Sequence, residues 1–244
     1  MGRDVARPLE VSVVVPTLNE REAIGLLAPR LAAALARYEY EVVVVDDSST
    51  DGTAEEVQRI AAHHPWRLYV RKGERGLASA VLLGMQIASG TVIVGIDADG
   101  SHPPEILPSL IQPILAGSAE MTIASRHVPG GASPGLIGSR RMLSWGGALL
   151  ARPLTPVKDP MSGFFAVRRD VLVRGNLTPL GYKIVLEVLV KCRPSPAVEV
   201  PFVFAPRSAG LSKLGSGEVG RYLRHVGRLY AWTLTGRRRA STTR

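Results

Sequence analysis

Residues 91–100 read TVIVGIDADG, an apolar run that ends in two aspartates separated by one residue. Residues 41–47, EVVVVDD, and residues 10–16, EVSVVVP, repeat the pattern of an apolar run followed by a polar or chain-bending residue. Continuous apolar runs of this length are typical of strands buried on both faces, as in a parallel sheet covered by helices. The pattern therefore predicts an α/β fold whose strands end at a polar edge.

Segments with helical spacing of apolar residues separate the predicted strands, as expected for a mostly parallel sheet. The expected strands are residues 10–15, 41–45, 66–70, 91–96, 120–125, 163–167 and 198–204. The expected helices are residues 22–38, 53–63, 77–88, 105–116, 139–151 and 182–191, with loops at 128–138 and 207–217. Ligands of such sheets bind beyond the carboxyl ends of the strands, which is where the paired aspartates fall.

The composition fits a globular domain. The chain has 244 residues, of which 45% are hydrophobic and 21% charged, and we expect a catalytic domain at 1–217 and a basic tail at 218–244. Its one cysteine, Cys192, excludes a disulfide framework or a cysteine-built zinc site and is expected in the core. No apolar run approaches the roughly 18 residues of a membrane-spanning helix, and the N-terminus lacks a signal peptide. We expect a cytoplasmic protein.

The basic excess lies at the C-terminus. Residues 207–244 hold 9 of the 30 Lys and Arg but 1 of the 21 Asp and Glu, which is +8 of the net +9. From residue 219 onward, apolar residues occupy one helical face and basic residues the other, which predicts a basic amphipathic helix that ends at Gly236. The apolar face is Val219, Tyr222, Leu223, Val226, Leu229 and Tyr230, and the basic face is Arg221, Arg224, His225 and Arg228. Either the apolar face packs on the domain, or the helix binds an anionic membrane.

Asp97 and Asp99 are the strongest site candidates. Two carboxylates that follow a buried strand lower the stability of the fold unless a cation compensates their charge. Mg²⁺ prefers one or two carboxylates together with phosphate oxygens and water. The alternative is an ordinary turn. His102 follows closely and is expected to be structural or to support the metal site from behind rather than to bind the metal.

Other residues are expected near the same edge. Asp47 ends a strand where doubly wound folds read a base or ribose, although it could belong to a plain polar turn. Residues 16–20, PTLNE, would line the same crevice, with Glu20 either there or at the start of the next helix. Neither a Gly-x-Gly-x-x-Gly pattern nor a Walker lysine loop is present, which disfavours dinucleotide oxidoreductases and P-loop enzymes.

Five basic residues lie near or between the predicted loops and would suit phosphate oxygens. They are Arg126, Arg140, Arg141, Arg207 and Lys213. Together with the acidic pair they would serve two phosphorylated ligands. The alternative for any single one of them is surface solubility.

Seven stretches in order resemble the family-2 glycosyltransferases, and within them the polyprenol (dolichol) phosphate mannose synthases. They are VSVVVPTLNERE, VVVVDDSSTDGT, GIDADGSHPPE, ASRHVPGG, DPMSGFFAVRR, GYKIVLE and RSAGLSKLG, and they span about residues 10–230. The resemblance implies a GT-A (Rossmann-like) fold, a nucleotide-sugar donor, usually GDP-mannose, and a polyprenyl phosphate acceptor at a membrane surface.

The resemblance also assigns residues. Positions implied to hold the nucleotide sugar are Pro16, Leu18, Glu20, Val45, Asp47, Asp97, Ala98, Asp99, Lys183, Arg207 and Lys213. Positions implied at the acceptor phosphate are Arg126, Arg140 and Ser144, and those at a Mg²⁺ or Mn²⁺ ion are Asp97, Asp99 and Ser101. Leu18 stands where the family often has Tyr, and Ser101 where some members have a metal-binding Gln. Asp99, Arg126 and Arg140 would carry the catalysis.

The expected reaction is single-displacement, inverting transfer of mannose from GDP to the lipid phosphate. The acceptor oxygen is already anionic at neutral pH, so no general base is needed. One alternative keeps the lipid acceptor and uses a UDP-sugar such as UDP-glucose. A more remote alternative is a non-catalytic module that binds membranes or nucleic acid through its tail, although we expect no nucleic-acid partner. The chain either docks on the cytoplasmic face of a membrane by its tail or uses a membrane-protein partner.

Overall fold

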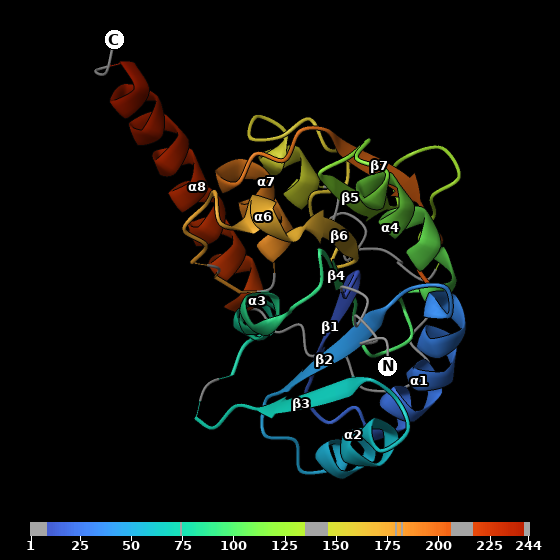
Figure 1. The fold of residues 1–244 in the computed structure, drawn as a ribbon. Coiled ribbons are helices and arrows are strands. Elements are labelled where there is room, and N and C mark those ends of the chain that lie inside the picture. Colours follow the sequence, from blue (N-terminus) through green and yellow to red (C-terminus); the bar gives the residue numbers. More distant parts are fainter. Residues whose placement is uncertain are drawn as a thin grey trace, which may run out of the picture.

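The computed structural model describes residues 9–73, 75–134, 146–178, 180–181, 183–205 and 217–241. Its centre is a seven-stranded sheet of order β3-β2-β1-β4-β6-β5-β7, with helices on both faces (Figure 1). The strands are β1 (Val11–Thr17), β2 (Tyr40–Asp46), β3 (Trp66–Val70), β4 (Val92–Gly95), β5 (Met121–Ser125), β6 (Phe165–Arg168) and β7 (Ala197–Pro201). Only β6 runs antiparallel to its neighbours, β4 and β5. The predicted, mostly parallel α/β sheet is confirmed.

The helices follow the strands as the alternating pattern predicted. They are α1 (Arg21–Leu35), α2 (Thr53–Ala61), α3 (Leu77–Ile87), the short 3₁₀ helix η1 (Pro104–Ile106), α4 (Leu107–Leu115), α6 (Arg169–Leu172), α7 (Ile184–Lys191) and α8 (Gly217–Ser241). Residues 146–151 are also helical. None of the helices in the described residues is long and apolar enough to cross a lipid bilayer.

Two hydrophobic layers sandwich the sheet. Helices α1, α2 and α4 cover one face, where Val13 and Val15 of β1 pack with Ile24 of α1. Helices α3 and α7 cover the other face, where Val14 of β1 packs with Ile93 of β4. Successive residues of β1 thus point into different layers, and every residue of this strand is buried. This two-sided burial is the physical reason for the continuous apolar runs in the sequence.

Gly90 lies where the chain enters β4 and touches the backbone of β1. A Cβ atom on Gly90 would lie 2.6 Å from the Ser12 nitrogen and 2.7 Å from the Val11 carbonyl carbon. Because these atoms belong to the central strand, they cannot shift without disturbing its pairing. We expect Gly90→Ala to lower the free energy of unfolding by about 1–3 kcal/mol, measured by urea denaturation.

Gly227→Ala is the matched control, because a Cβ atom there meets nothing within 4 Å. It lies within α8, so the change should leave stability equal or slightly raised. A Gly90→Ala chain as stable as wild type would contradict this account of the β1–β4 junction.

Several predicted boundaries differ from the structure. The strand expected at 198–204 ends at Pro201, and beyond it only an isolated bridge joins Val203 to Ala132. The helix expected at 105–116 begins as the 3₁₀ turn η1 and continues as α4, with Pro113 inside it. The helix expected at 139–151 is seen at 146–151, because residues 135–145 lie outside the described residues.

The prediction that Gly236 ends the C-terminal helix was wrong. Helix α8 continues to Ser241. A glycine inside a helix costs only about 1 kcal/mol relative to alanine. Arginine has a high intrinsic helix propensity, so the arginines that follow Gly236 in the sequence are compatible with a continued helix.

The apolar face of α8 packs on the domain. Tyr222, Val226 and Leu229 are buried and belong to one cluster with Met161 and with Leu186 of α7. In Figure 1, α8 lies outside α7, and its last turns extend beyond the body of the protein. Of the two interpretations left open by the sequence, packing on the core accounts for this face.

His225 of α8 is buried at this interface, and no hydrogen-bond partner of its Nε2 atom is found among the described residues. Burial lowers the pKa of the imidazole. The negative charge of Glu187 and a backbone hydrogen bond to Lys183 oppose that shift, and the charges of Lys191 and Arg228 add to it. The folded chain therefore keeps His225 neutral at a pH where the unfolded chain protonates it.

The contribution of neutral His225 to the free energy of unfolding is complete above the pKa of histidine in the unfolded chain, about 6.5. It is lost as the pH falls from there through the lower pKa of His225 in the folded chain. We expect His225→Asn, which does not titrate, to flatten the decline of thermal stability between pH 7 and pH 5. The exposed His63 is the control, and His63→Asn should leave that decline unchanged. An equal decline in wild type and His225→Asn would remove His225 as its source.

Candidate active site

Several of the predicted site residues that the structure describes lie at the carboxyl edge of the sheet. Strands β1 and β2 are parallel and in register, so that Pro16 lies beside Val45 and Thr17 beside Asp46. The loops that follow β1, β2, β4 and β5 therefore emerge at the same edge. Parallel sheets bind ligands at this edge.

The loops after β1 and β2 hold each other in place. The Oδ1 atom of Asn19 accepts a hydrogen bond of 2.8 Å from the Thr50 backbone, and the Glu20 nitrogen donates to Thr53 Oγ1 at 2.9 Å. Leu18 and Glu20 are half-buried in this junction. The structure thus brings Pro16, Leu18, Glu20 and Val45 together, while their predicted contact with a nucleoside stays a prediction.

Asp47 forms a buried ion pair that the sequence did not reveal. Its Oδ1 atom accepts from Arg71 Nε at 2.7 Å, and its Oδ2 atom accepts from the Gly76 nitrogen at 2.9 Å. Arg71 also donates to Ser79 Oγ and to the Gly76 carbonyl, at 2.9 and 3.0 Å. Both carboxylate oxygens of Asp47 are therefore engaged within the protein, and the pair connects β2 to the start of α3.

The loop that follows β4 contains Asp97 and Asp99, and the two carboxylates differ in burial and in hydrogen bonding. Asp99 is buried, and its Oδ1 atom accepts hydrogen bonds from the nitrogen and hydroxyl of Ser101, at 3.0 and 2.6 Å. The side chain of Asp97 keeps 34% of its surface exposed. Gly163 lies beside it, and a Cβ there would make ordinary contact with Asp97 Oδ2 at 3.6 Å. Ser101 thus orients Asp99, and whether it also binds metal stays a prediction.

His102 supports this loop from the protein interior. Its Nδ1 atom accepts a hydrogen bond of 3.1 Å from the Asp97 backbone nitrogen, and its ring stacks on Phe164 with 5.0 Å between centroids. Burial lowers the pKa of His102. Asp97 and Asp99 raise it by their charge, and Arg126 and Lys183 lower it. His102 thus contacts Asp97 on one side and phenylalanine rings on the other, as expected for a residue that supports the site from behind.

The Asp97–Asp99 pair fits a hard divalent cation that is shared with phosphate. The described residues hold no cluster of three or more His, Cys, Asp or Glu that could bind a metal without other ligands. One buried carboxylate and one partly exposed carboxylate are the donor set that Mg²⁺ or Mn²⁺ completes with water and phosphate oxygens. The residues present therefore fit such an ion.

Arg126 follows β5 and is held by Asp159. Its Nε and Nη2 atoms donate to the two carboxylate oxygens at 2.7 and 2.8 Å, and its backbone nitrogen donates at 3.0 Å. Burial raises the pKa of Asp159, but the hydrogen bond and charge of Arg126 outweigh it and hold that pKa below its usual range. Asp159 opens the DPMSGFF stretch, yet no sequence argument singled it out as part of the site.

Lys183 lies just before α7, and its Nζ atom donates to the Met161 carbonyl at 2.7 Å. It is thereby tied to the loop that contains Asp159. The remaining predicted residues, Arg140, Ser144, Arg207 and Lys213, lie outside the described residues. Their roles stay predictions.

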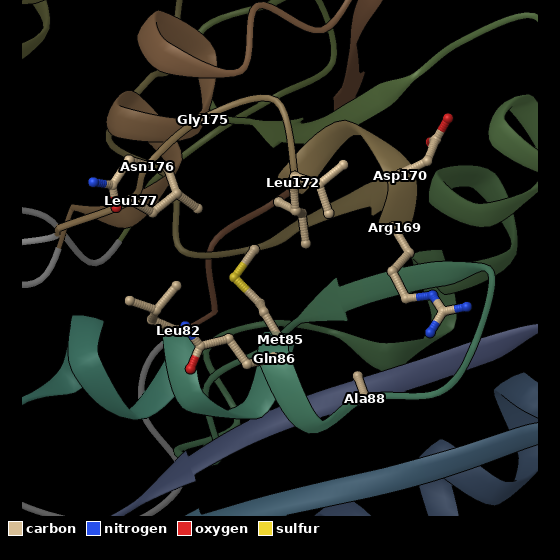
Figure 2. Close-up of a pocket in the computed structure, with 11 residues that line it drawn as sticks. Leu82, Met85, Gln86, Ala88, Arg169, Asp170, Leu172, Gly175, Asn176 and Leu177 are labelled. Carbon is tan, nitrogen blue, oxygen red and sulfur yellow. The ribbon is translucent and has the colours of Figure 1, made fainter.

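One cavity lined by described residues lies elsewhere. It measures about 620 Å³ and lies between α3 and the segment around α6. Figure 2 shows the Met85 side chain pointing from α3 towards Leu172 across this cavity. Because the Arg169 nitrogen bonds to the Thr91 carbonyl at the start of β4, the cavity lies at the edge opposite Asp97.

The fold and the carboxylate edge define an α/β protein with a ligand-binding edge, and comparison with known proteins identifies the family. The profile described as "Glycosyl transferase family 2" matches residues 12–175. The chain belongs to this family, and it is a glycosyltransferase.

Three relatives resemble most of the chain. The dolichol-phosphate mannosyltransferase of Pyrococcus furiosus is 44% identical over 92% of this chain, which spans 64% of that relative's length. The enzyme of the same name from Saccharomyces cerevisiae is 39% identical, over 92% of this chain and 88% of the relative. The undecaprenyl-phosphate mannosyltransferase of Micrococcus luteus is 35% identical, over 94% and 96%.

A solved structure supports the predicted GT-A type of fold. Glucosyl-3-phosphoglycerate synthase from Mycobacterium tuberculosis, crystallised with Mn²⁺, UDP and glucosyl-3-phosphoglycerate, has a TM-score of 0.67 to this chain. It is 22% identical and covers 91% of this chain and 78% of its own. At that identity the likeness concerns the fold.

Proposed function

We propose that the chain transfers mannose from GDP-mannose to a polyprenyl phosphate, with inversion at the sugar carbon. The observation that supports this most strongly is the juxtaposition around His102. The Oδ2 atom of Asp97, from the carboxylate pair suited to a metal–diphosphate, lies 3.8 Å from His102 Nδ1. The Phe204 ring lies 6.0 Å from the His102 ring and 5.7 Å from the guanidinium carbon of Arg126, the arginine suited to a second phosphate. Two phosphorylated ligands are what a sugar-nucleotide and a lipid phosphate would bring. The names of the three relatives support the choice of sugar and acceptor.

The donor would bind across the ends of β1, β2 and β4. Pro16, Leu18, Glu20 and Val45 would line the nucleoside end, and Asp47 would shape it through its bond to the Gly76 nitrogen. Asp97 and Asp99 would hold Mg²⁺ or Mn²⁺, which stabilises charge on the leaving diphosphate. Lys183, Arg207 and Lys213 would neutralise the remaining phosphate charge.

The acceptor would lie at the end of β5. A phosphate monoester has a second pKa of about 6, so its oxygen is anionic and attacks the sugar carbon directly. The bond from that carbon to the diphosphate oxygen breaks, and GDP leaves. The acceptor phosphate would be aligned with the sugar carbon by Arg126, Arg140 and Ser144. Holding the two reactants in the reactive geometry lowers the barrier to the transfer.

Thermal stabilisation by nucleotides tests the donor assignment. A ligand that binds only the folded state raises the melting temperature. We expect GDP and GDP-mannose to raise it in the presence of Mn²⁺, and UDP and UDP-glucose to leave it unchanged. A rise in melting temperature with UDP and UDP-glucose would replace GDP-mannose by a UDP-sugar as the proposed donor. No shift with any of the four would contradict a nucleotide-sugar enzyme.

Helix α8 would bring the enzyme to the cytoplasmic face of a membrane. With its apolar face packed on the domain, Arg221, Arg224 and Leu223 remain exposed, the last at 52%. Each basic residue near an anionic surface contributes about 1 kcal/mol. We expect Arg221→Glu with Arg224→Glu to weaken binding to phosphatidylserine vesicles at least about tenfold.

This double substitution keeps the packed face of α8 intact, which deletion of residues 218–244 would not. Arg37→Glu, at an exposed position in the turn that follows α1, is the control and should bind vesicles as wild type does. If the double variant bound vesicles as tightly as Arg37→Glu does, the basic residues of α8 would not contribute to membrane binding.

A further inference from the structure

We propose that Asp159 is a positioning residue for the acceptor phosphate, because it fixes the guanidinium of Arg126 in one orientation. This inference rests on the proposed function. Asp159 would not touch the substrate. It would act through Arg126, by determining which N–H groups remain directed to a ligand.

The contact between the two residues is rigid and closed to solvent. Asp159 is fully buried, and 10% of the Arg126 side chain is exposed. Three donors of Arg126, one from its backbone and two from its side chain, converge on the two oxygens of Asp159. The Phe204 ring packs 5.7 Å from the guanidinium carbon. The plane of the guanidinium is thus restrained from two sides.

Strand β7 holds Asp159 in turn. The two carboxylate oxygens of Glu199 accept hydrogen bonds from the backbone nitrogens of Lys158 and Asp159, at 2.9 and 3.0 Å. Because β7 pairs directly with β5, these bonds connect the Asp159 turn to the strand that carries Arg126. Glu199 therefore fixes the position of Asp159, and Asp159 fixes the orientation of Arg126.

The geometry leaves one edge of the guanidinium for a ligand. Arginine has five N–H donors in a planar fork. Asp159 takes the edge formed by Nε and Nη2, and no described residue accepts a hydrogen bond from Nη1. Within the described part of the chain, the edge formed by Nη1 and Nη2 therefore keeps parallel donors, which suit two oxygens of a phosphate.

The pair also changes what Arg126 contributes. Arg126 and Asp159 are together neutral, so Arg126 offers directed hydrogen bonds rather than net positive charge. The two roles predict opposite signs for one substitution. If Arg126 acted by charge alone, Asp159→Asn would strengthen phosphate binding. If it acts by direction, the same change weakens binding, because the amide NH₂ faces the guanidinium donors.

The test compares Asp159→Asn with Glu120→Gln. Glu120 precedes the opposite end of β5, where it pairs with Arg168 and Arg174 far from the site, so its substitution perturbs stability alone. We expect Asp159→Asn to raise the KM for a short polyprenyl phosphate at least about tenfold, while stabilisation by GDP with Mn²⁺ is unchanged. Glu120→Gln should leave both values unchanged. An acceptor KM that is equal or lower in Asp159→Asn would overturn the proposal.

A second measurement does not need turnover. The Nε–H resonance of Arg126, assigned by its loss in Arg126→Lys, should exchange slowly with water in wild type and rapidly in Asp159→Asn. Geranyl phosphate should shift it in wild type only. If wild type transfers no sugar but this behaviour is seen, the proposed function fails and the positioning role stands. If geranyl phosphate shifts the resonance equally in both proteins, the positioning role fails.

Discussion

Asp99→Ala is expected to abolish sugar transfer while the chain remains folded. Asp99 is buried, and Ser101 orients its Oδ1 atom. The substitution removes the oriented carboxylate of the pair and with it the charge that would hold a divalent cation at the leaving diphosphate. Loss of that stabilisation of about 4 kcal/mol corresponds to about a 1000-fold fall in kcat/KM.

The control for this substitution is Asp170→Ala. Asp170 lies in α6, beside the remote cavity, and 58% of its side chain is exposed. It should keep wild-type turnover. In Asp99→Ala, the Mn²⁺-dependent part of the stabilisation by GDP should disappear as well. Turnover within a few fold of wild type would remove Asp99 from the metal site.

Arg71→Met is expected to cause a large loss of stability. Arg71 is buried, and its removal leaves the carboxylate of Asp47 uncompensated and the Gly76 carbonyl without one of its donors. Breaking one side of a buried ion pair typically costs about 3–5 kcal/mol. Urea denaturation, followed by circular dichroism, measures the difference.

Two further variants separate charge burial from lost packing. Arg67→Met breaks the neighbouring pair with Glu41, in which 51% of the arginine side chain is exposed, and should cost about 1 kcal/mol or less. Asp47→Asn combined with Arg71→Met removes the buried charge and should recover part of the loss. If Arg71→Met cost no more than Arg67→Met, the Asp47–Arg71 pair would not stabilise this edge of the sheet.

The sequence predicted the layered α/β sheet and the position of the acidic residues, because both depend on local patterns. Val13, Val14 and Val15 form one apolar run since each is buried in one of two layers. The aspartates at the end of β2 and in the loop after β4 lie at the ligand edge because parallel strands share a direction. These features follow from periodicity over a few residues.

The partners of the charged residues could not be predicted in the same way. Arg71 lies 24 residues from Asp47, and Asp159 lies 33 residues from Arg126. Which charges meet depends on how distant loops pack, and also on the antiparallel strand β6 between β4 and β5. The DPMSGFF stretch contained the one signal for Asp159. Its role became visible only once the fold placed it against Arg126.

The most direct measurement is sugar transfer itself. The 244-residue chain is incubated with GDP-[¹⁴C]mannose, Mn²⁺ and a short polyprenyl phosphate, and the label is extracted into organic solvent. The account predicts a mild-acid-labile mannosyl lipid with inverted configuration, formed only when metal and lipid phosphate are both present. Absence of labelled lipid, together with transfer from UDP-glucose or from neither donor, would contradict the proposed mannosyltransferase.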